Sequence, residues 1–356
     1  MPRVFVSVLI DTYNHERYIE DAVNSALAQD FPASDREIVV VDDGSTDRTP
    51  EVLAKFGSQI RILRKPNGGQ ASAFNLAIPQ CRGEIVSMLD GDDWWAPDKV
   101  SRAAAAFAER PSVGIVGHGN IEVYPDGATR IETIKENPYF HIDSVQSARL
   151  FRLRKSFLGT CRMSCRADLL RRILPVPESL IVEADEYIFT LAAFFSDVFI
   201  LSEPLLFYRI HGQNWFNVSD GKLASLQRKH AIMVALGESL RQRFSQENIP
   251  ENLSEVVLEC VQTEADMLAL SLGRGSPLTT IRTELRNYRI MQGHASLLRG
   301  FLKCVSLFPA LFVSPARYVA FKQKLAANTS YRRAREAVLP FYRPKHVDYI
   351  DEKSSR

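Results

Sequence analysis

Cysteine is scarce in this 356-residue sequence, and the five cysteines do not fit a disulfide framework. Their number is odd and they are widely scattered, in a chain large enough to fold without covalent staples. Cys161 and Cys165 lie close together, but no second Cys or His pair follows at the spacing of a zinc site. We therefore predict that Cys161 and Cys165 are buried apolar thiols and that the protein lies in a reducing compartment, the cytoplasm.

Charge of one sign and long apolar runs are also missing. The net charge is only +2, and 46% hydrophobic with 24% charged residues is typical of a folded globular protein, which argues against a disordered or collagen-like chain. The apolar run at 305–313 is shorter than the ~20 residues that span a bilayer, and it contains Pro309. Residues 4–10 follow one basic residue, Arg3, without the cleavage site of a secretory signal. We expect neither a transmembrane helix nor such a signal.

Apolar strand-like runs alternate with helical patterns in the first third of the chain. Asn14 is expected to cap the first helix, which includes residues 19–27. The expected strands are residues 4–10, 38–41, 60–63, 85–89 and 113–116, and the later helices are 50–56, 69–78 and 97–108. Because strand–helix–strand units connect by right-handed crossovers, they predict an α/β fold with a mostly parallel sheet flanked by helices.

The alternation stops at about Lys222, and long amphipathic helices follow with a break at 273–277. We therefore predict two parts, an α/β domain at residues 1–217 and a helical carboxyl-terminal region at residues 218–356.

Glycine is missing from the turn after the first predicted strand, which reads Asp11-Thr12-Tyr13-Asn14-His15. A dinucleotide-binding fold needs glycines there so that a pyrophosphate can approach the backbone. No glycine-rich loop ending in Gly-Lys-Ser/Thr occurs either. The sequence thus disfavours a dehydrogenase, a P-loop NTPase and a nucleotidyltransferase. Tyr13 can stack on a base or pack beside the sheet.

Acidic residues stand instead at the ends of the second and fourth predicted strands, as Asp42-Asp43 and Asp90-Gly91-Asp92. Ligands of parallel sheets bind beyond the carboxyl ends of the strands. Two carboxylates that flank one glycine on such a loop suit a hard divalent cation with open positions for phosphate oxygens. A plain turn whose acids cap the next helix is the alternative.

Several motifs occur together in one order across the first part of the chain. They are residues 6–14, 39–47, 67–70 and 89–93, together with Asn75. On these residues the sequence resembles the family 2 glycosyltransferases of the GT-A fold. The resemblance implies an inverting transferase that acts on a nucleotide-diphosphate sugar with Mg²⁺ or Mn²⁺, and it makes residues 1–217 the catalytic domain.

The resemblance also implies a donor site. Thr12, Tyr13 and Asp43 would contact the nucleoside, while the Asp90–Asp92 motif would bind the ribose and the metal on the diphosphate. The residues implied to bind the nucleotide sugar are Thr12, Tyr13, Asn14, Asp43, Gln70, Asn75, Asp90 and Gly91, and the implied metal ligands are Asp92 and His211.

One position departs from the family pattern, because Asp11 stands where the family usually has proline. A further carboxylate near the donor pocket is expected to repel diphosphate or to alter the choice of donor. A structural partner such as Arg36 or the amide of a helix N-terminus would remove this effect.

The segment Glu183-Ala184-Asp185-Glu186 resembles the acceptor-side acidic motif of the family. Inversion requires a base that takes the proton of the acceptor hydroxyl as its oxygen attacks opposite the leaving diphosphate. We assign this role to Asp185, with Glu183 and Glu186 as alternatives. Acids that only favour a helix N-terminus are the other interpretation.

Residues 208–214 resemble the segment that closes the catalytic domain of the family. On this resemblance His211 would reach the metal or the diphosphate, and Arg209 would offset phosphate charge.

The carboxyl-terminal region is basic on both sides of the apolar run at 305–313. Between residues 299 and 345 the single acid is Glu336, and the basic residues are Arg299, Lys303, Arg317, Lys322, Lys324, Arg332, Arg333, Arg335, Arg343 and Lys345. Such a segment can bind anionic headgroups at the surface of a membrane. A solvated basic face on a helix that docks on the domain is the alternative. Without a recognition motif, nucleic acid is disfavoured.

We therefore expect a metal-dependent glycosyltransferase of polysaccharide biosynthesis, cytoplasmic and peripheral at the inner face of the membrane. Its expected donor is a UDP-, GDP- or dTDP-sugar, and its expected acceptor is a hydroxyl group of a glycan or a lipid-linked glycan. A degenerate module that binds nucleotide sugars without turnover is the alternative function.

Overall fold

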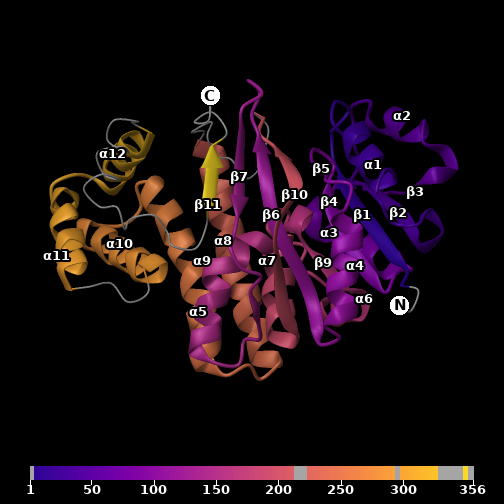
Figure 1. Cartoon of the computed structure of the whole chain (residues 1–356). Helices are drawn as coiled ribbons and strands as arrows, with labels where there is room; N and C mark the ends of the chain where they lie inside the picture. Colours follow the sequence, from indigo (N-terminus) through magenta and orange to yellow (C-terminus); the bar gives the residue numbers. More distant parts are fainter. Residues whose placement is uncertain (1–3, 212–222, 293–296, 328–347, 352–356) are drawn as a thin grey trace. The chain divides into compact units, whose positions relative to one another are not determined.

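The computed structural model describes residues 4–211, 223–292, 297–327 and 348–351 of the chain (Figure 1). The chain divides into two compact units. Unit 1 comprises residues 1–147, 154–214 and 347–356, and unit 2 comprises residues 148–153 and 215–346.

A mixed sheet, with eleven strands among the described residues, runs through unit 1. The strand order is β11-β7-β6-β9-β4-β1-β2-β3, and β10 pairs with β5, β6 and β8. The strands are β1 (Val6–Thr12), β2 (Arg36–Asp42), β3 (Arg61–Arg64), β4 (Ile85–Asp90), β5 (Trp94–Trp95), β6 (Val113–Val123), β7 (Thr129–Thr133), β8 (Tyr139–Phe140), β9 (Ser164–Arg166), β10 (Asp197–Arg209) and β11 (Asp348–Asp351).

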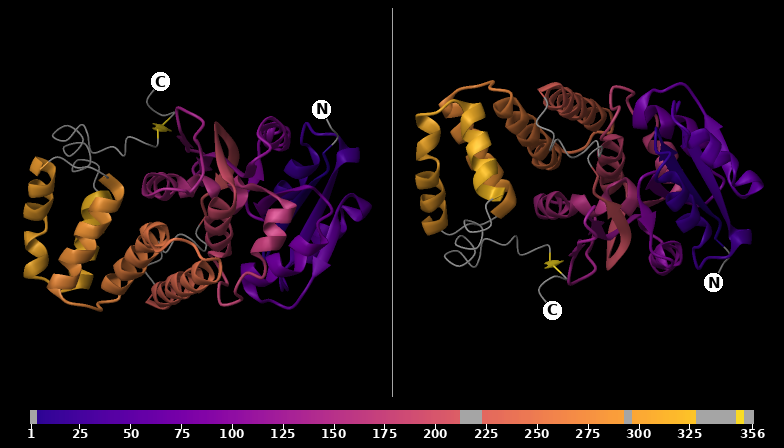
Figure 2. Two further views of the ribbon diagram at one scale, coloured as in Figure 1. Left: turned by 90° about the horizontal axis from the view of Figure 1, so that it is seen from below. Right: turned by 90° about the horizontal axis from the view of Figure 1, so that it is seen from above.

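Helices flank this sheet on both faces (Figure 2). They are α1 (Ile19–Leu27), α2 (Thr49–Ala54), α3 (Gly69–Ala77), α4 (Lys99–Glu109), α6 (Ala167–Ile173), α7 (Ala184–Phe195) and the first residues of α5 (Val145–Arg154). Helices α1 and α3 pack on β1, and α4 and α7 pack on β6 and β10. The predicted α/β class, with a sheet between helices, is confirmed.

The parallel part of the sheet is the part that the strand–helix alternation predicted. Strand β1 pairs in parallel with β2 and with β4, and β2 pairs in parallel with β3. The antiparallel strands β7, β8 and β9 come from segments without that alternation. Strands β1, β2 and β4 are apolar and buried on both faces, because helices cover both sides of the sheet.

Asn14 does not cap the first helix, which corrects our prediction. Helix α1 begins at Ile19 after Tyr18, and no side chain caps it. Asn14 lies earlier, with a left-handed backbone at φ 58°, and its Oδ1 accepts the backbone N–H of Thr46 at 2.8 Å. The amide therefore ties the loop after β1 to the loop after β2.

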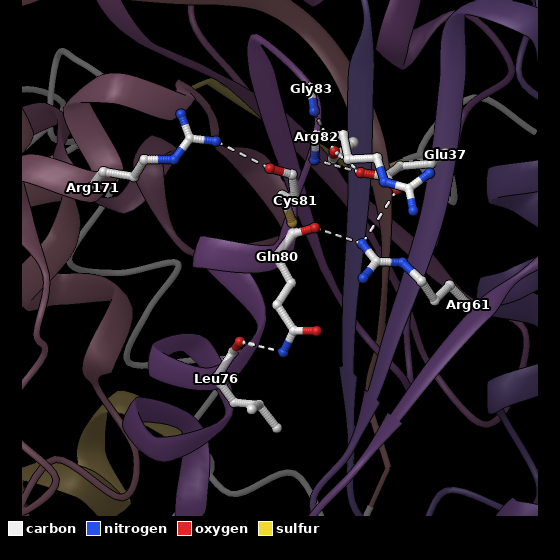
Figure 3. A network of polar contacts seen from close by, with 9 residues as sticks. Glu37, Arg61, Leu76, Gln80, Cys81, Arg82, Gly83 and Arg171 are labelled. Carbon is white, nitrogen blue, oxygen red and sulfur yellow. Dashed lines mark hydrogen bonds and ion pairs between the residues drawn. The ribbon is translucent and has the colours of Figure 1, made fainter.

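A polar network closes the sheet at the amino-terminal ends of β1, β2 and β4 (Figure 3). The Glu37 carboxylate accepts the hydroxyl of Ser7 at 2.6 Å, the backbone N–H of Arg82 at 2.6 Å and the guanidinium of Arg61 at 3.3 Å. Arg61 also donates to the Gln80 carbonyl at 2.6 Å (Figure 3). An acid that sits among several donors holds the loop before β4 against the neighbouring strands.

Unit 2 is helical. Its helices are α8 (Leu223–Gln246), α9 (Glu251–Ser271), α10 (Pro277–Gln292), α11 (Leu297–Ser306) and α12 (Pro315–Ala327), with a 3₁₀ turn, η7 (Phe308–Leu311). Helix α9 packs against α8, α10 and α12. The predicted break at 273–277 is confirmed, because α9 ends at Ser271 and α10 begins at Pro277.

No helix within the described ranges combines the length and the apolar character that crossing a bilayer requires. The longest of these helices, α8 (Leu223–Gln246), contains five charged residues, Arg228, Lys229, Glu238, Arg241 and Arg243.

Candidate active site

The carboxyl ends of three parallel strands bring the predicted donor residues together. In the strand register Thr12 lies beside Asp42, and Asp11 lies beside Asp90. The backbone N–H of Asp43 then donates to the Thr12 carbonyl at 2.9 Å, so the two loops continue side by side beyond the sheet. The acids of β2 and β4 thus flank the end of β1, as expected for the binding edge of a parallel sheet.

Gly91 allows the loop after β4 to press against the loop after β1. A Cβ at this position would lie 2.6 Å from Thr12 Oγ1 and 2.8 Å from His15 Nδ1, so a side chain does not fit there. The backbone N–H of Gly91 donates to the Asp11 carbonyl at 2.9 Å. The glycine between the two acids is therefore explained by close packing, and it fixes where both carboxylates stand.

Asp92 forms a close pair with His211. His211 Nε2 lies 3.0 Å from Asp92 Oδ2, and both side chains keep a small exposed fraction of 11% and 15%. Burial alone would raise the pKa of Asp92, but the hydrogen bond from His211 and the charges of His15 and His211 hold it below the ordinary value. Tyr18 stacks on the His211 ring at a centroid distance of 4.8 Å and fixes its orientation.

The Asp92–His211 pair fits a divalent cation. Two neighbouring ligands of one Mg²⁺ or Mn²⁺ lie about 3 Å apart when each is ~2.1 Å from the ion, which is the spacing of these two atoms. Carboxylate oxygen with imidazole nitrogen is also an ordinary donor set for Mn²⁺. The family resemblance implied that these two residues, 119 positions apart in the sequence, are the metal ligands.

A second group, Asp90, Asp93 and Cys161, has ligand atoms within 4.8 Å of one another. The Cys161 Sγ lies 3.1 Å from a carboxylate oxygen of each aspartate and accepts the backbone N–H of Asp90 at 3.2 Å. Burial, followed by the charges of Asp90 and Asp93, raises the pKa of Cys161, so the thiol keeps its proton. A protonated soft thiol does not suit Mg²⁺ or Mn²⁺, and we read this group as an internal hydrogen-bond network.

The sequence did not lead us to predict a role for Asp93 in the site or any contact of Cys161 with it. Asp93 is fully buried, and burial followed by the charges of Asp92 and Asp90 raises its pKa. The sequence offered one signal, a third acid directly after the Asp90–Asp92 motif, and it gave none for a thiol some seventy residues later. Cys161 and Cys165 are free and buried, as predicted.

Asp11 and Asp90 face each other at the end of the paired strands β1 and β4. Oδ1 of each is buried without a hydrogen-bond partner, while Asp90 Oδ2 accepts the Cys161 thiol. Burial, followed by the charge of Asp90, raises the pKa of Asp11 well above its ordinary value. Burial, followed by the charge of Asp92, raises that of Asp90 to about 7. Both acids therefore hold a proton more tightly than an exposed aspartate does.

Arg36 is not the partner of Asp11, which corrects one of our expectations. Its guanidinium donates to the backbone carbonyls of Leu27, Gln29 and Phe31 and so holds the end of α1. The carboxylate of Asp11 instead lies against Asp90 at the binding edge.

Asp43 binds the loop that precedes α3. Its carboxylate accepts the backbone N–H groups of Gly68 at 3.0 Å and Gly69 at 2.7 Å, and it forms an ion pair with Lys65. Gly69 has φ +81°, and a Cβ there would lie 2.6 Å from Ile181 Cα, so both its backbone conformation and its neighbours require glycine. The loop therefore connects the donor edge to the segment ahead of α7.

Gln70 links the donor side of the site to the acceptor-side acids. Its Nε2 donates to Thr160 Oγ1 at 3.1 Å, and its Oε1 accepts the backbone N–H of Ala184 at 3.1 Å. The backbone N–H of Thr160 in turn donates to Asp185 Oδ2 at 3.0 Å. Residues from α3, the 3₁₀ turn at Thr160–Arg162 and α7 thus form one connected group.

The three candidate bases differ in their surroundings. Glu186 is 7% exposed and forms an ion pair with Lys155, so its charge is already compensated. Glu183 is 8% exposed and has a left-handed backbone at φ 63°, immediately before α7. Asp185 keeps a partly exposed side chain, and burial raises its pKa above the ordinary value. Its charge also contributes to the raised pKa of Asp90, which places the two acids in one electrostatic environment.

The remaining predicted residues have these positions. Tyr13 is half-buried beside Thr12 at the end of β1. Asn75 Nδ2 donates to the Val176 carbonyl at 2.8 Å and its Oδ1 accepts the Val176 N–H at 2.8 Å, so its amide holds that loop. The donor contacts assigned to Tyr13, Asn14 and Asn75 stay predictions.

Arg209 holds the loop after β4. Its backbone N–H donates to Asp93 Oδ1 at 2.8 Å, its Nε donates to the Asp92 carbonyl at 2.9 Å, and its Nη2 forms an ion pair with Asp21 at 2.7 Å. Residues 212–214 of the predicted closing segment lie outside the described residues.

Residues 7–172 match Glycosyl transferase family 2, a span that includes the strand ends, the Asp90–Asp92 motif and Cys161. This span is just under half of the chain, and over it the predicted resemblance to that family is confirmed. Asp185 and His211 lie beyond the matched span.

The chain is similar to an uncharacterized glycosyltransferase of Nostoc sp., with 34% identity over 219 residues that cover 59% of this chain and 66% of that protein. TarS of Staphylococcus aureus, a poly(ribitol-phosphate) beta-N-acetylglucosaminyltransferase, is 38% identical over 195 residues, 46% of this chain and 34% of TarS. The alignments thus span just under two thirds of the first relative and about a third of the second.

Two solved structures share the fold. The structure of a TarS fragment in complex with UDP-GlcNAc has a TM-score of 0.53 at 21% identity and covers 90% of this chain and 92% of that one. The mannosyltransferase PcManGT of Pyrobaculum calidifontis, in complex with GDP-Man and Mn²⁺, has a TM-score of 0.50 at 19% identity, with 93% and 83% covered. They confirm the predicted GT-A fold.

Proposed function

We propose that this protein is an inverting glycosyltransferase, which transfers a sugar from a nucleotide-diphosphate donor to a hydroxyl group of a glycan or a lipid-linked glycan. One observation carries the proposal. The backbone N–H of Thr160 donates to Asp185, the thiol of the next residue, Cys161, lies 3.1 Å from Asp90, and the charge of Asp185 contributes to the raised pKa of Asp90. A metal-binding edge beside a partly exposed carboxylate is what inverting transfer requires.

The donor is proposed to bind at the carboxyl ends of β1, β2 and β4. Thr12, Tyr13 and Asp43 are proposed to contact the nucleoside, and Asp90 is proposed to bind the ribose; the strand register that brings Thr12 beside Asp42 and Asp11 beside Asp90 supports this. The relatives support a nucleotide sugar, since TarS is solved with UDP-GlcNAc and PcManGT with GDP-Man. A UDP-, GDP- or dTDP-sugar therefore remains our proposed donor.

Asp92 and His211 are proposed to hold Mg²⁺ or Mn²⁺ on the diphosphate. The bound cation would neutralise charge that builds up on the leaving nucleoside diphosphate. The lowered pKa of Asp92 keeps this carboxylate ionised at neutral pH, as a metal ligand must be. Tyr18 keeps the imidazole of His211 facing it.

Asp185 is proposed to take the proton from the attacking acceptor hydroxyl. Its pKa is raised by burial, which makes the carboxylate a better base than an exposed aspartate. The N–H groups of Thr160 and Glu186 each donate to one of its oxygens, so the carboxylate is oriented while each oxygen retains a lone pair. Glu186, which is paired with Lys155, is less suited to this role.

We further propose that the protein is cytoplasmic and that its basic carboxyl-terminal region holds it at the inner face of a membrane, where lipid-linked acceptors lie.

The test is release of nucleoside diphosphate from a panel of nucleotide sugars, with Mn²⁺ or Mg²⁺ and again with chelator. We expect chelator-sensitive release from one donor, stimulated by acceptor. Binding across the panel without release, even with varied acceptors, would instead support a degenerate nucleotide-sugar-binding module. The Asp11–Asp90 pair, which adds a carboxylate at the donor edge, is the feature that makes this alternative worth testing.

A further inference from the structure

An apolar ridge projects from unit 2 around the turn between α11 and α12. Phe308 and Phe312 are 62% and 72% exposed, which is far more than a side chain of a packed core retains. Their rings contact each other edge to face, with centroids 5.1 Å apart. The exposed apolar residues that make up the ridge are Val305, Phe308, Leu311, Phe312, Val313 and Phe321.

The ridge is not a poorly packed part of the core of unit 2. The other face of the same segment is already filled, because Leu307, Ala310, Tyr318 and Val319 pack with Leu270 of α9 and are at most 7% exposed. Turn η7 thus separates the apolar residues of this segment into an inner set and an outer set. The outer set remains 39–72% exposed, and such exposed apolar patches mark interaction sites.

Basic residues surround the ridge. The sequence contains no aspartate or glutamate between Glu284 and Glu336. Arg317 and Lys324, on the helix that follows the ridge, are exposed. Lys303, two residues before Val305, and Lys322, next to Phe321, both bind the buried Glu284, which compensates one of their two charges. The surface around the exposed phenylalanines is therefore positively charged.

We propose that this ridge inserts into the interfacial region of a bilayer that contains anionic lipids. Exposed aromatic rings at a turn, within a basic surface, match the chemistry of such a surface, in which acyl chains lie below anionic headgroups. A second copy of this chain fits less well, because it would bring two positive surfaces together. The inference deepens the peripheral contact proposed above, and it does not require that the enzyme transfers sugar.

The buried residues of η7 hold the exposed phenylalanines of the ridge in a fixed position before they insert. Leu307 and Ala310 are buried in the cluster that includes Leu270 of α9, so the packing of the turn sets which side chains face outward. Insertion therefore requires little ordering of the chain, which reduces the entropy lost on binding. Apolar burial would supply the affinity, and the basic residues would supply the preference for anionic lipid.

Sedimentation of the full chain with vesicles tests the proposal. We expect binding to vesicles of equal parts phosphatidylcholine and phosphatidylglycerol, and much weaker binding to phosphatidylcholine alone. The double variant Phe308→Ser and Phe312→Ser should lose at least about 100-fold in vesicle affinity, as expected for two buried aromatic side chains. Leu278→Ser is the matched control, because Leu278 in unit 2 is 63% exposed but lies outside the ridge.

A second measurement keeps the test independent of how the double variant folds. Phe308→Trp should show a blue shift of tryptophan emission when anionic vesicles are added, and Leu278→Trp should show none. Absence of binding by the wild-type chain, equal binding by the double variant, or a shift in both tryptophan variants would overturn the proposal. Self-association that the serine variants abolish, without vesicle binding, would assign the ridge to a second copy instead.

Release of nucleoside diphosphate from the nucleotide-sugar donor, measured with a soluble acceptor and without vesicles, separates this proposal from the proposed function. The serine variants should retain it. A chain that binds vesicles through the ridge but never releases nucleoside diphosphate would leave the membrane contact standing and would contradict only the transferase.

Discussion

Acidic side chains have different surroundings at the two edges of the parallel sheet in unit 1. At the amino-terminal edge, Glu37 accepts hydrogen bonds from Ser7, Arg61 and the backbone of Arg82 (Figure 3). At the carboxyl-terminal edge, Asp11 and Asp90 face each other, and each has a buried oxygen without a partner. The pKa of Asp90 is raised by burial and by neighbouring acids.

This difference distinguishes an acid that stabilises the fold, Glu37, from acids that we propose to serve ligand binding, Asp11 and Asp90. A buried carboxylate with several donors stabilises the native state, whereas buried acids that repel each other destabilise it. Such a cluster persists where its function requires it, and groups with perturbed pKa values gather at functional sites. Variants at the carboxyl-terminal edge should therefore change activity, and variants at the amino-terminal edge should change stability.

The largest expected effect belongs to the proposed base. Asp185→Asn removes the group that takes the acceptor proton, so kcat should fall about 10³-fold, while the Kd for the donor stays the same. Glu186→Gln is the matched control at the next residue, and it should lower stability through loss of the Lys155 ion pair more than it lowers kcat. Single-turnover kinetics and calorimetry measure the two quantities. A larger loss of kcat in Glu186→Gln would reassign the base.

The next effect belongs to the proposed metal ligand. Asp92→Ala should weaken metal-dependent donor binding by roughly 100-fold, because the cation on the diphosphate loses an anionic ligand. Calorimetry with donor and Mn²⁺ measures the affinity, and titration with chelator gives the reference without metal. If wild type and Asp92→Ala bind donor equally with metal present, the metal assignment is wrong.

At the opposite edge Glu37→Gln should change stability alone. Loss of charge-assisted hydrogen bonds from a largely buried carboxylate should lower the free energy of unfolding by about 2 kcal/mol, with kcat unchanged. Urea denaturation measures the first quantity. Glu109→Gln is the control, since the ion pair of Glu109 with Arg110 is exposed and should contribute little. A fall in kcat without a loss of stability would contradict the assignment of a purely structural role to the amino-terminal edge.

The smallest effect is a pH dependence at the carboxyl-terminal edge. Asp90 has a pKa of about 7 in the folded protein, above its ordinary value of 3.8. Between these values the folded state keeps a proton that the unfolded state has lost, so this group makes stability fall as pH rises, by up to about 1.4 kcal/mol per pH unit.

Asp11→Asn should reduce the fall of stability with rising pH by an amount on the order of 1 kcal/mol over the window from pH 4 to 7, because Asp11, whose own pKa is raised by burial and by the charge of Asp90, no longer titrates. The difference between wild-type and variant unfolding curves in chelator isolates this contribution from the other titrating groups. Parallel curves for the two proteins would show that the pKa of Asp11 is not raised in the folded protein.

The sequence determined the alternating strands and helices of the first part of the chain and the order of its acidic motifs. Local periodicity encodes each element, and the register of parallel strands then places Thr12, Asp42 and Asp90 at one edge. The metal pair Asp92 and His211 could be proposed only through the family resemblance, because 119 residues separate them.

Other features were decided by the tertiary structure alone. The Cys161 thiol between Asp90 and Asp93, the bond of Asn14 to Thr46 and the engagement of Arg36 away from Asp11 all depend on how distant loops pack. Likewise, the apolar composition of residues 305–313 was visible in the sequence, but not which side chains face outward. Periodicity fixes the faces of one element, whereas contacts between elements depend on the packing of the whole chain.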